Sequence, residues 1–150
     1  MTTRRLDQSP MKHLLGYAVA QARVTTTRAF VEAIGEPLDL RPTEFSLLML
    51  LLANPSVTQK ELAAALNLNA PNLTLLVARM EERKLVQRER SDTDRRAQYV
   101  RLSAPGRTLA ERARKVSLAM EAPIRTRYSD AEWAILLELL QRAGGAEARA

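Results

Sequence analysis

Residues 58–80 read TQKELAAALNLNAPNLTLLVARM, and this stretch decides the fold. Thr58 and Glu61 form a capping box, in which Thr58 caps a short helix and Glu61 reaches back to it. A second helix is expected from Ala70–Pro71 to about Arg83, because proline is tolerated in a first helical turn. Two short helices at this spacing are typical of a helix-turn-helix.

The link between these two helices fits the same motif. A helix-turn-helix needs a small residue where its helices cross, and Ala63 meets this need shortly before the first helix ends near Ala65. Four residues after the crossing, the turn needs a positive φ angle, which Asn67 tolerates better than most residues. One apolar stripe of the second helix is expected to face the core: Leu73, Leu76, Val77 and Met80.

The opposite face of the second helix is small, polar and mostly uncharged near its start, which suits a helix lying in a DNA major groove. Asn72 can pair with adenine, Thr74 and Leu75 can touch a thymine methyl, and Arg79 can reach guanine or a phosphate. An ordinary helical hairpin with a solvated face is the alternative. The candidate DNA-contacting residues of this motif are Thr58, Gln59, Pro71, Asn72, Thr74, Leu75 and Arg79.

A β-hairpin is expected directly after the second helix. Residues 86–90 and 98–102 alternate polar and apolar side chains, the two-residue period of strands, and residues 91–96 read as the loop between them. Arginines on a projecting loop suit a narrow, electronegative minor groove, and an aspartate beside them can hold one in position. A solvated turn is the alternative, which the preceding helix-turn-helix disfavours. The candidate DNA-contacting residues here are Arg88, Asp94, Arg95 and Arg96.

The rest of the chain reads as helical. Apolar spacing predicts a helix from Met11 to about Ile34, stopped by Gly35 and Pro37, and another from Pro42 to just before Asn54. Two further helices complete the pattern: one is capped by Ser103 and reaches about Ala122, where Pro123 ends or kinks it, and the last opens with the capping box Ser129–Glu132.

The predicted fold is therefore mainly α with a small β-hairpin wing (α+β). The chain, residues 1–150, is expected to be a single domain. Within it we expect a winged helix-turn-helix lobe over residues 42–103. Residues 11–36 and 104–143 are expected to form a helical dimerisation region, because they carry more apolar side chains than a small core can cover.

Composition limits the function classes. The net charge of +6 and the pI of about 10.3 favour a polyanionic partner, nucleic acid first, although a basic soluble protein without such a partner fits the charge equally well. The absence of cysteine excludes disulfides and thiolate metal sites, and a single histidine, His13, disfavours a metal cluster. We expect no cofactor. The longest apolar run, Leu47–Ala53, is too short to span a bilayer, and the N-terminus does not read as a signal peptide, so a cytoplasmic location is expected.

At this point the chain resembles the MarR family of winged-helix regulators. The matching segments are residues 73–86, then Arg88, then Asp94–Arg96, then Val100–Ser103 and Gly106. The resemblance implies a homodimer built from the first and the last two helices, and a pseudo-palindromic site on double-stranded DNA. It also implies that Arg96 enters the minor groove with Asp94 as its partner. Two residues depart from the family pattern: Lys84 stands where glycine is frequent, and Pro123 interrupts the long fifth helix.

The resemblance further implies a transcriptional repressor that a small aromatic or phenolic effector releases from DNA. Candidate effector-binding residues on the first helix are His13, Tyr17, Arg23 and Arg28, since arginine pairs well with an aromatic carboxylate; surface or interface residues without a ligand are the alternative. An enzyme is not expected, because the chain has no glycine-rich phosphate loop, nucleophile motif or metal-ligand cluster. The alternative function is a winged-helix module for protein–protein interaction without DNA binding.

Overall fold

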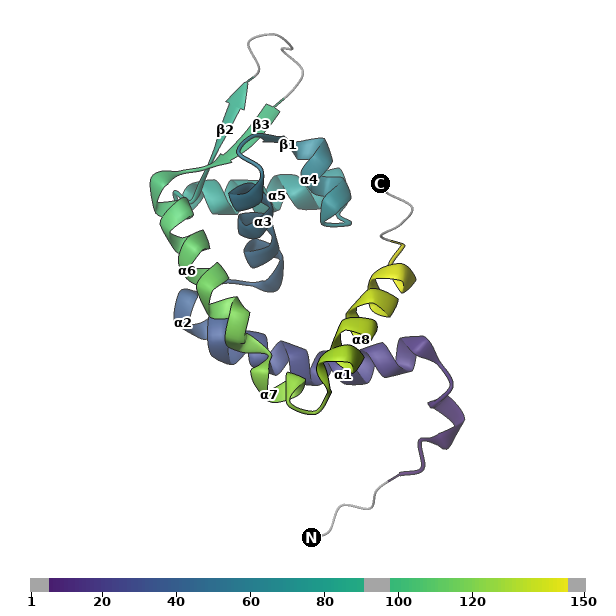
Figure 1. Ribbon diagram of the computed structural model, residues 1–150. Helices are drawn as coiled ribbons and strands as arrows, with labels where there is room; N and C mark the ends of the chain where they lie inside the picture. Colours follow the sequence, from purple (N-terminus) through teal and green to yellow (C-terminus); the bar gives the residue numbers. More distant parts are fainter. Residues whose placement is uncertain (1–5, 91–97, 146–150) are drawn as a thin grey trace. The chain divides into compact units, whose positions relative to one another are not determined.

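The computed structural model describes residues 6–90 and 98–145 of the chain (Figure 1). Its elements in chain order are a short 3-10 turn η1 (Ser9–Met11), α1 (Leu15–Phe30), a π-helical turn η2 (Val31–Gly35), α2 (Glu36–Leu38), α3 (Pro42–Ala53), β1 (Val57–Thr58), α4 (Gln59–Ala65), α5 (Ala70–Glu82), β2 (Val86–Arg90), β3 (Gln98–Leu102), α6 (Ala104–Met120), α7 (Ala122–Arg125) and α8 (Asp130–Ala143). The expectation of a mainly helical chain with a small β-hairpin is confirmed.

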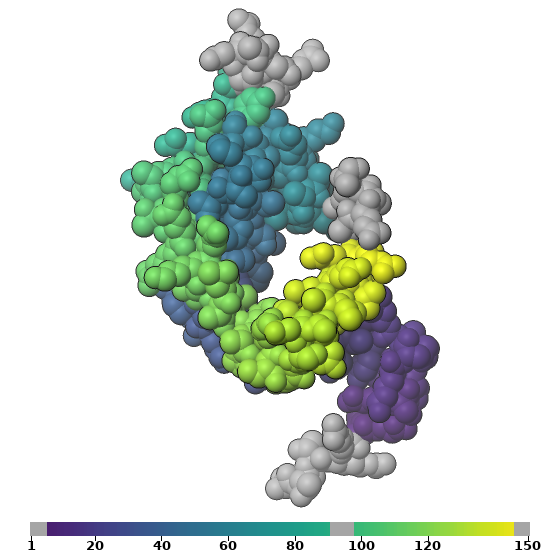
Figure 2. Space-filling view, viewed as in Figure 1, coloured from purple at the N-terminus to yellow at the C-terminus, as the bar shows by residue number. Residues whose placement is uncertain are grey.

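The chain divides into two compact units, which are described separately. Residues 30–119 form one unit, and the segments up to Ala29 and from Met120 onward form the other. Every buried apolar side chain among the described residues lies in the unit of residues 30–119. In that unit, β3 contacts both α3 and α4, and Figure 2 shows the green atoms of α6 beside the blue atoms of α3. The unit extends beyond the expected lobe of residues 42–103 at both ends.

A three-stranded antiparallel sheet joins the hairpin to the start of the helix-turn-helix. The expected strands β2 and β3 are present with the expected bounds, and Val86 pairs with Leu102 at the base of the hairpin. The third strand, β1, was not expected from the sequence because it has only two residues and a non-local partner. Val57 of β1 pairs with Val100, and Thr58 with Tyr99, so β3 lies between β1 and β2. The hairpin is therefore anchored to the residue that caps α4.

Both helices of the helix-turn-helix end in a left-handed residue. Asn67 has φ 53°, and the backbone N–H of Leu68 donates to the carbonyl of Ala63 at 2.9 Å, which confirms the expected turn. Lys84 repeats this geometry after α5 with φ 59°. The chain therefore keeps the left-handed cap, although the Cβ atom of lysine, which glycine lacks, makes this conformation costly. The expected apolar stripe of α5 is buried: Leu73, Leu76, Val77 and Met80.

The expected first helix, Met11 to Ile34, differs from the structure. Regular α-helix begins only at Leu15, and Gly35 and Pro37 do not stop the helical path, which continues through η2 and α2 to Leu38. The π-helical turn shifts the hydrogen-bond register before Pro37, which has no backbone N–H to donate. The path ends at Asp39, which has φ 50°. Near the other end of the chain, α6 stops at Met120, and Pro123 lies in the first turn of α7.

The two expected capping boxes are confirmed. The Glu61 carboxylate accepts from the Thr58 hydroxyl at 2.7 Å and from the Thr58 backbone N–H at 2.8 Å, and these bonds hold the pKa of Glu61 below its ordinary value. Ser129 and Glu132 make the same arrangement at the start of α8, and the pKa of Glu132 is lowered by the same kind of bonds. Both helix starts are therefore most stable when these carboxylates are ionised, and they weaken as the pH falls through the lowered pKa values.

The junction between α5, the hairpin and α6 is tightly packed. Ser103 caps α6 as expected: its hydroxyl donates to the carbonyl of Lys84 at 2.6 Å and accepts from the backbone N–H of Gly106 at 3.0 Å. A Cβ atom placed on Gly106 would lie 1.8 Å from the backbone oxygen of Leu85. Only glycine fits here, because the neighbouring atom belongs to the backbone and cannot rotate away.

Among the described residues, no helix has the length and apolar character needed to cross a lipid bilayer. The same residues hold no group of three or more His, Cys, Asp or Glu side chains placed to bind a metal ion.

The junction generates a prediction. Gly106→Ala is expected to lower the free energy of unfolding by about 3 kcal/mol, since the new methyl group must push the backbone of Leu85 away. Gly16→Ala is the matched control, because nothing lies within 4 Å of the corresponding Cβ position in α1, and it is expected to stabilise the chain by about 0.5–1 kcal/mol. Urea denaturation at one protein concentration measures both; equal midpoints for the two variants would contradict the packing argument.

Candidate nucleic-acid interface

The start of α5 is held by a side-chain cap. The Asn69 side-chain oxygen accepts from the backbone N–H of Asn72 at 2.9 Å. Asparagine is among the preferred N-cap residues, and Asn69 precedes Ala70–Pro71 directly, so this cap was recognisable from the sequence although it was not singled out. The cap fixes the backbone of Asn72, whose side chain is exposed.

The first two turns of α5 present a nearly uncharged exposed surface. Pro71, Asn72, Thr74 and Leu75 are all exposed, and the large apolar side chain of Leu75 keeps 66% of its surface accessible. The Thr74 hydroxyl donates to the carbonyl of Ala70 at 2.9 Å, so its proton is used within the helix. The surface therefore offers an exposed amide, apolar carbon and a hydroxyl acceptor on a helix whose other side is buried.

The two candidates at the start of α4 have partners inside the protein. The Thr58 hydroxyl belongs to the capping box with Glu61. The Gln59 side-chain amide donates to the side-chain oxygen of Gln98 at 2.8 Å, which ties the first residue of α4 to β3. The role of Gln98 depends on the non-local β1–β3 pairing, which sequence patterns do not reveal.

Arg88 of β2 is engaged within the protein. Its Nη1 lies 3.2 Å from Glu81 Oε2, its Nη2 donates to the carbonyl of Thr74 at 3.2 Å, and its backbone N–H donates to Glu81 Oε1 at 3.0 Å. Its buried Nε atom has no hydrogen-bond partner in the described part of the chain. The tight turn after α5 brings the arginine against Glu81, so Arg88 ties the hairpin to α5. Its expected contact with a DNA phosphate stays a prediction.

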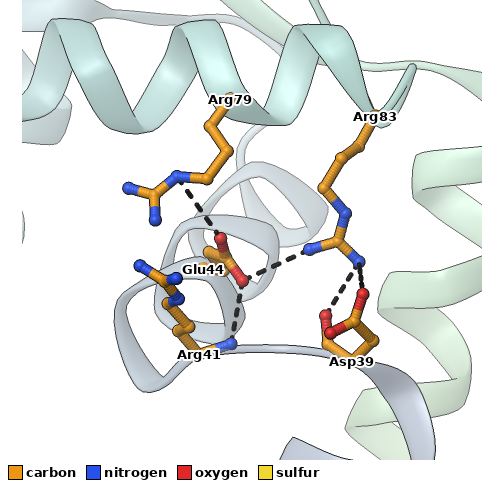
Figure 3. Close-up of polar contacts among 5 residues, drawn as sticks. All are labelled: Asp39, Arg41, Glu44, Arg79 and Arg83. Atoms are coloured by element: carbon orange, nitrogen blue, oxygen red, sulfur yellow. Dashed lines mark hydrogen bonds and ion pairs between the residues drawn. The ribbon is translucent and has the colours of Figure 1, made fainter.

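Arg79 of α5 and Arg83, the residue directly after α5, converge on one buried carboxylate. Figure 3 shows Glu44 of α3 between the two arginines, with Arg79 Nε 3.7 Å from Glu44 Oε1 and Arg83 Nη1 3.3 Å from Glu44 Oε2. The Arg83 side chain also donates to the backbone oxygen of Asp39 at 2.8 Å. Sequence reasoning missed Glu44, since a glutamate in a first helical turn is an ordinary feature and its partners lie on another helix.

The other two arginines of the hairpin strands differ in whether a carboxylate of the protein pairs with them. Arg90 is exposed, whereas Arg101 lies 3.1 Å from Glu89 on the neighbouring strand. Three candidates, Asp94, Arg95 and Arg96, lie outside the described residues.

The four candidate effector residues lie in the segment up to Ala29. His13 precedes α1 rather than lying on it, and Arg23 and Arg28 are exposed on α1. Tyr17 is half-buried, and its hydroxyl donates to the side-chain oxygen of Gln8 at 2.7 Å. A hollow of about 460 Å³ in the other unit has different lining residues: Phe45, Ser46, Met49, Leu50, Ala53, Ala65 and Leu66.

Comparison with known proteins gives consistent matches. Residues 38–97 match the model of the MarR family. The solved structure of the transcriptional repressor CouR bound to a 23-mer DNA duplex is similar to this chain, with 31% identity, a TM-score of 0.87, and coverage of 94% of this chain and 99% of that one. A candidate transcriptional regulatory protein for the hcr operon of Thauera aromatica is 27% identical over 85% of this chain and 77% of its own length. A helix-turn-helix-type transcriptional repressor of Mycobacterium tuberculosis is 28% identical over 92% of this chain and 96% of its own.

The contacts of Arg88 generate a prediction. Arg88→Ala is expected to lower the free energy of unfolding by about 1–2 kcal/mol, because it leaves the half-buried Glu81 carboxylate without its partner. Arg90→Ala removes the same charge from an exposed position two residues along β2, and it is expected to change stability by less than about 0.5 kcal/mol. Urea denaturation of the two variants measures the difference. If Arg88→Ala is as stable as Arg90→Ala, Arg88 does not tie the hairpin to α5.

Proposed function

The chain belongs to the MarR family of winged-helix transcriptional regulators, and we propose that it is a homodimeric repressor that binds a pseudo-palindromic DNA operator and is released by a small aromatic acid. The observation that carries this proposal is the exposed surface at the start of α5, where Asn72 and Leu75 project from a helix whose opposite side is buried. A helix reads base edges through such a surface when it lies in the major groove. The similar protein CouR was solved bound to a DNA duplex, which supports DNA binding by this chain.

The proposed DNA contacts divide into three groups. Pro71, Asn72, Thr74, Leu75 and Arg79 are proposed to face the major groove. The hairpin is proposed to carry Asp94, Arg95 and Arg96 to the neighbouring minor groove, where arginine is favoured because it sheds its hydration more readily than lysine. Thr58 and Gln59 at the start of α4 and Arg88 of β2 are proposed as the third group, beside their intramolecular partners.

The proposed dimer rests on the apolar helices near the two ends of the chain. No residue of α8 is buried, and Ile135, Leu137, Leu139 and Leu140 each keep more than 40% of their surface exposed. Leu15 and Val19 of α1 are similarly exposed. Apolar surface of this extent is typical of an interface between subunits. We therefore propose residues 11–36 and 104–143 as the dimerisation region.

The proposed effector site uses His13, Tyr17, Arg23 and Arg28. The exposure of both arginines leaves them available to pair with a carboxylate, and the tyrosine ring offers an aromatic surface. A cytoplasmic regulator without enzymatic activity is part of the same proposal. A winged-helix module that binds proteins instead of DNA is the alternative. The affinity of a DNA-binding regulator for DNA should fall steeply as the salt concentration rises, and the alternative predicts no such salt-dependent DNA binding.

The proposed function predicts the effect of changing the hairpin. Fragments of genomic DNA that bind the protein are selected first. The selected duplex is then titrated with the protein at fixed salt. The expected stoichiometry is one protein chain per half-site. Arg96→Ala is expected to weaken binding by roughly 1–3 kcal/mol per half-site, and Arg96→Lys to recover part of the loss.

Arg114→Ala is the matched control, because it removes one exposed arginine of α6 and is expected to leave affinity nearly unchanged. Circular dichroism checks that each variant is folded. Selection that enriches no DNA fragment would overturn the proposed function, and a folded Arg96→Ala variant that binds as tightly as the parent would remove the hairpin from the DNA interface.

The proposed effector predicts a second result. Salicylate or 4-hydroxybenzoate is expected to raise the dissociation constant for the selected duplex by about 5- to 150-fold, the usual range of coupling between two binding sites. The double variant Arg23→Ala/Arg28→Ala is expected to respond less, because it lacks the partners of the carboxylate. Benzyl alcohol, which has no carboxylate, is the control compound. If no benzoic or phenolic acid in a broad panel changes the affinity, the chain is not regulated by this class of ligand.

A further inference from the structure

Glu44 is the one buried ionisable side chain in the described part of the chain, with 2% of its surface exposed. A buried carboxylate without partners is strongly destabilising, so its surroundings must supply hydrogen-bond donors or positive charge. Here both oxygens are engaged. Oε2 accepts from the backbone N–H of Arg41 at 2.8 Å and from Arg83 Nη1 at 3.3 Å, and Oε1 faces Arg79 Nε at 3.7 Å (Figure 3).

The two arginines of this cluster differ in which of their guanidinium nitrogens remain available to bind DNA. Arg83 uses Nη1 for Glu44 and Nη2 for Asp39, so its guanidinium group is occupied on both sides. Arg79 uses Nε alone: within the described residues, its two terminal amino groups contact no acceptor, and its side chain is 38% exposed. Figure 3 shows these terminal groups pointing away from the Glu44 carboxylate.

Arg79 lies on the side of α5 that is proposed to face the bases. Asn72, Leu75 and Arg79 follow one another at helical spacings of three and four residues, so they share one side of α5. An arginine recognises guanine by donating two parallel hydrogen bonds from one edge of its guanidinium plane. An ion pair at Nε limits rotation of that plane before any DNA arrives, which reduces the ordering cost of binding.

We propose that Glu44 is a positioning residue for DNA recognition: by holding Arg79 Nε, it orients the terminal amino groups of Arg79 to read a guanine in the major groove. This inference rests on the proposed function and names a residue that is itself too deeply buried to touch DNA. Because Arg83 and the backbone of Arg41 also bind Glu44, the carboxylate stays in place and acts as a fixed support for Arg79.

The test compares base preferences in a double-mutant cycle. The parent, Glu44→Gln, Arg79→Ala and the double variant are titrated against the selected duplex and against duplexes with one base pair changed at a time. Arg79→Ala is expected to abolish discrimination at one guanine position per half-site, a change of roughly 5- to 150-fold. Glu44→Gln is expected to reduce discrimination at that same position by at least about fivefold while preferences elsewhere stay unchanged, and to have no further effect when Arg79 is alanine.

Asp39→Asn is the matched control, because it removes the exposed carboxylate beside Arg83, and asparagine tolerates the left-handed backbone at this position. It is expected to leave all base preferences unchanged. Equal weakening by Glu44→Gln on every duplex, or an effect that persists in the Arg79→Ala background, would show that Glu44 supports only the fold. A uniform loss of affinity in Arg79→Ala would assign Arg79 to a phosphate and also overturn the inference.

A measurement on the parent protein covers the case in which Glu44→Gln does not fold. Nitrogen-15 NMR follows exchange of the Arg79 Nε proton with water, assigned by its loss in Arg79→Lys. The 3.7 Å separation between Arg79 Nε and Glu44 Oε1 is that of an ion pair and exceeds hydrogen-bond length, so the expected result is exchange slower than that of the exposed Arg114 Nε proton, in the free and in the DNA-bound protein. Exchange as fast as at Arg114 in either state would overturn the positioning role. If the parent selects no DNA at all, the proposed function fails and this role fails with it; if the parent selects DNA but the cycle shows no link to Arg79, only the role of Glu44 fails.

Discussion

The burial of one stripe of α5 is the constraint on which the rest of the interface depends. Leu73, Leu76, Val77 and Met80 have almost no exposed surface, so the rotation of α5 about its own axis is determined by the core. With 3.6 residues per turn, Asn72 and Leu75 must then face outward. The left-handed residues Asn67 and Lys84 end α4 and α5 at the places where the chain must turn, and the glycine-only junction at Gly106 holds the start of α6 against Leu85.

The arginines of this unit are of two kinds: those that a carboxylate of the protein occupies, and those that remain available to a polyanion. Arg83 is occupied by the buried Glu44, whose burial makes a charged partner necessary, and Arg88 is occupied by the half-buried Glu81. Those arginines stabilise the attachment of α5 to its surroundings and contribute little free positive charge. A net charge of +6 is therefore a poor guide to which side chains meet a polyanion, because the arginines that support the fold are counted together with those that remain available.

Much of the fold could be predicted because its signals are local. The capping boxes at Thr58 and Ser129, the alternating strands after α5 and the left-handed turn at Asn67 each involve residues within a few positions of one another. Two features were not predicted, for different reasons. Strand β1 exists because β3, which is distant in sequence, lies beside it. The helical path continues past Pro37 because a π-helical turn directly before it changes the hydrogen-bond register, a local feature that apolar spacing at 3.6 residues does not reveal.

By itself, the sequence determined the helix-turn-helix, the hairpin that follows it and the side of α5 that faces outward, since periodicity and caps are properties of neighbouring residues. Only the tertiary structure decided what each polar side chain is free to do. Arg83 meets Glu44 across 39 positions of the chain, Gln59 meets Gln98 across the same separation, and Arg88 turns back onto α5. These pairings arise from the way helices and strands pack, and a buried carboxylate selects its partners by distance in space, which no local sequence pattern records.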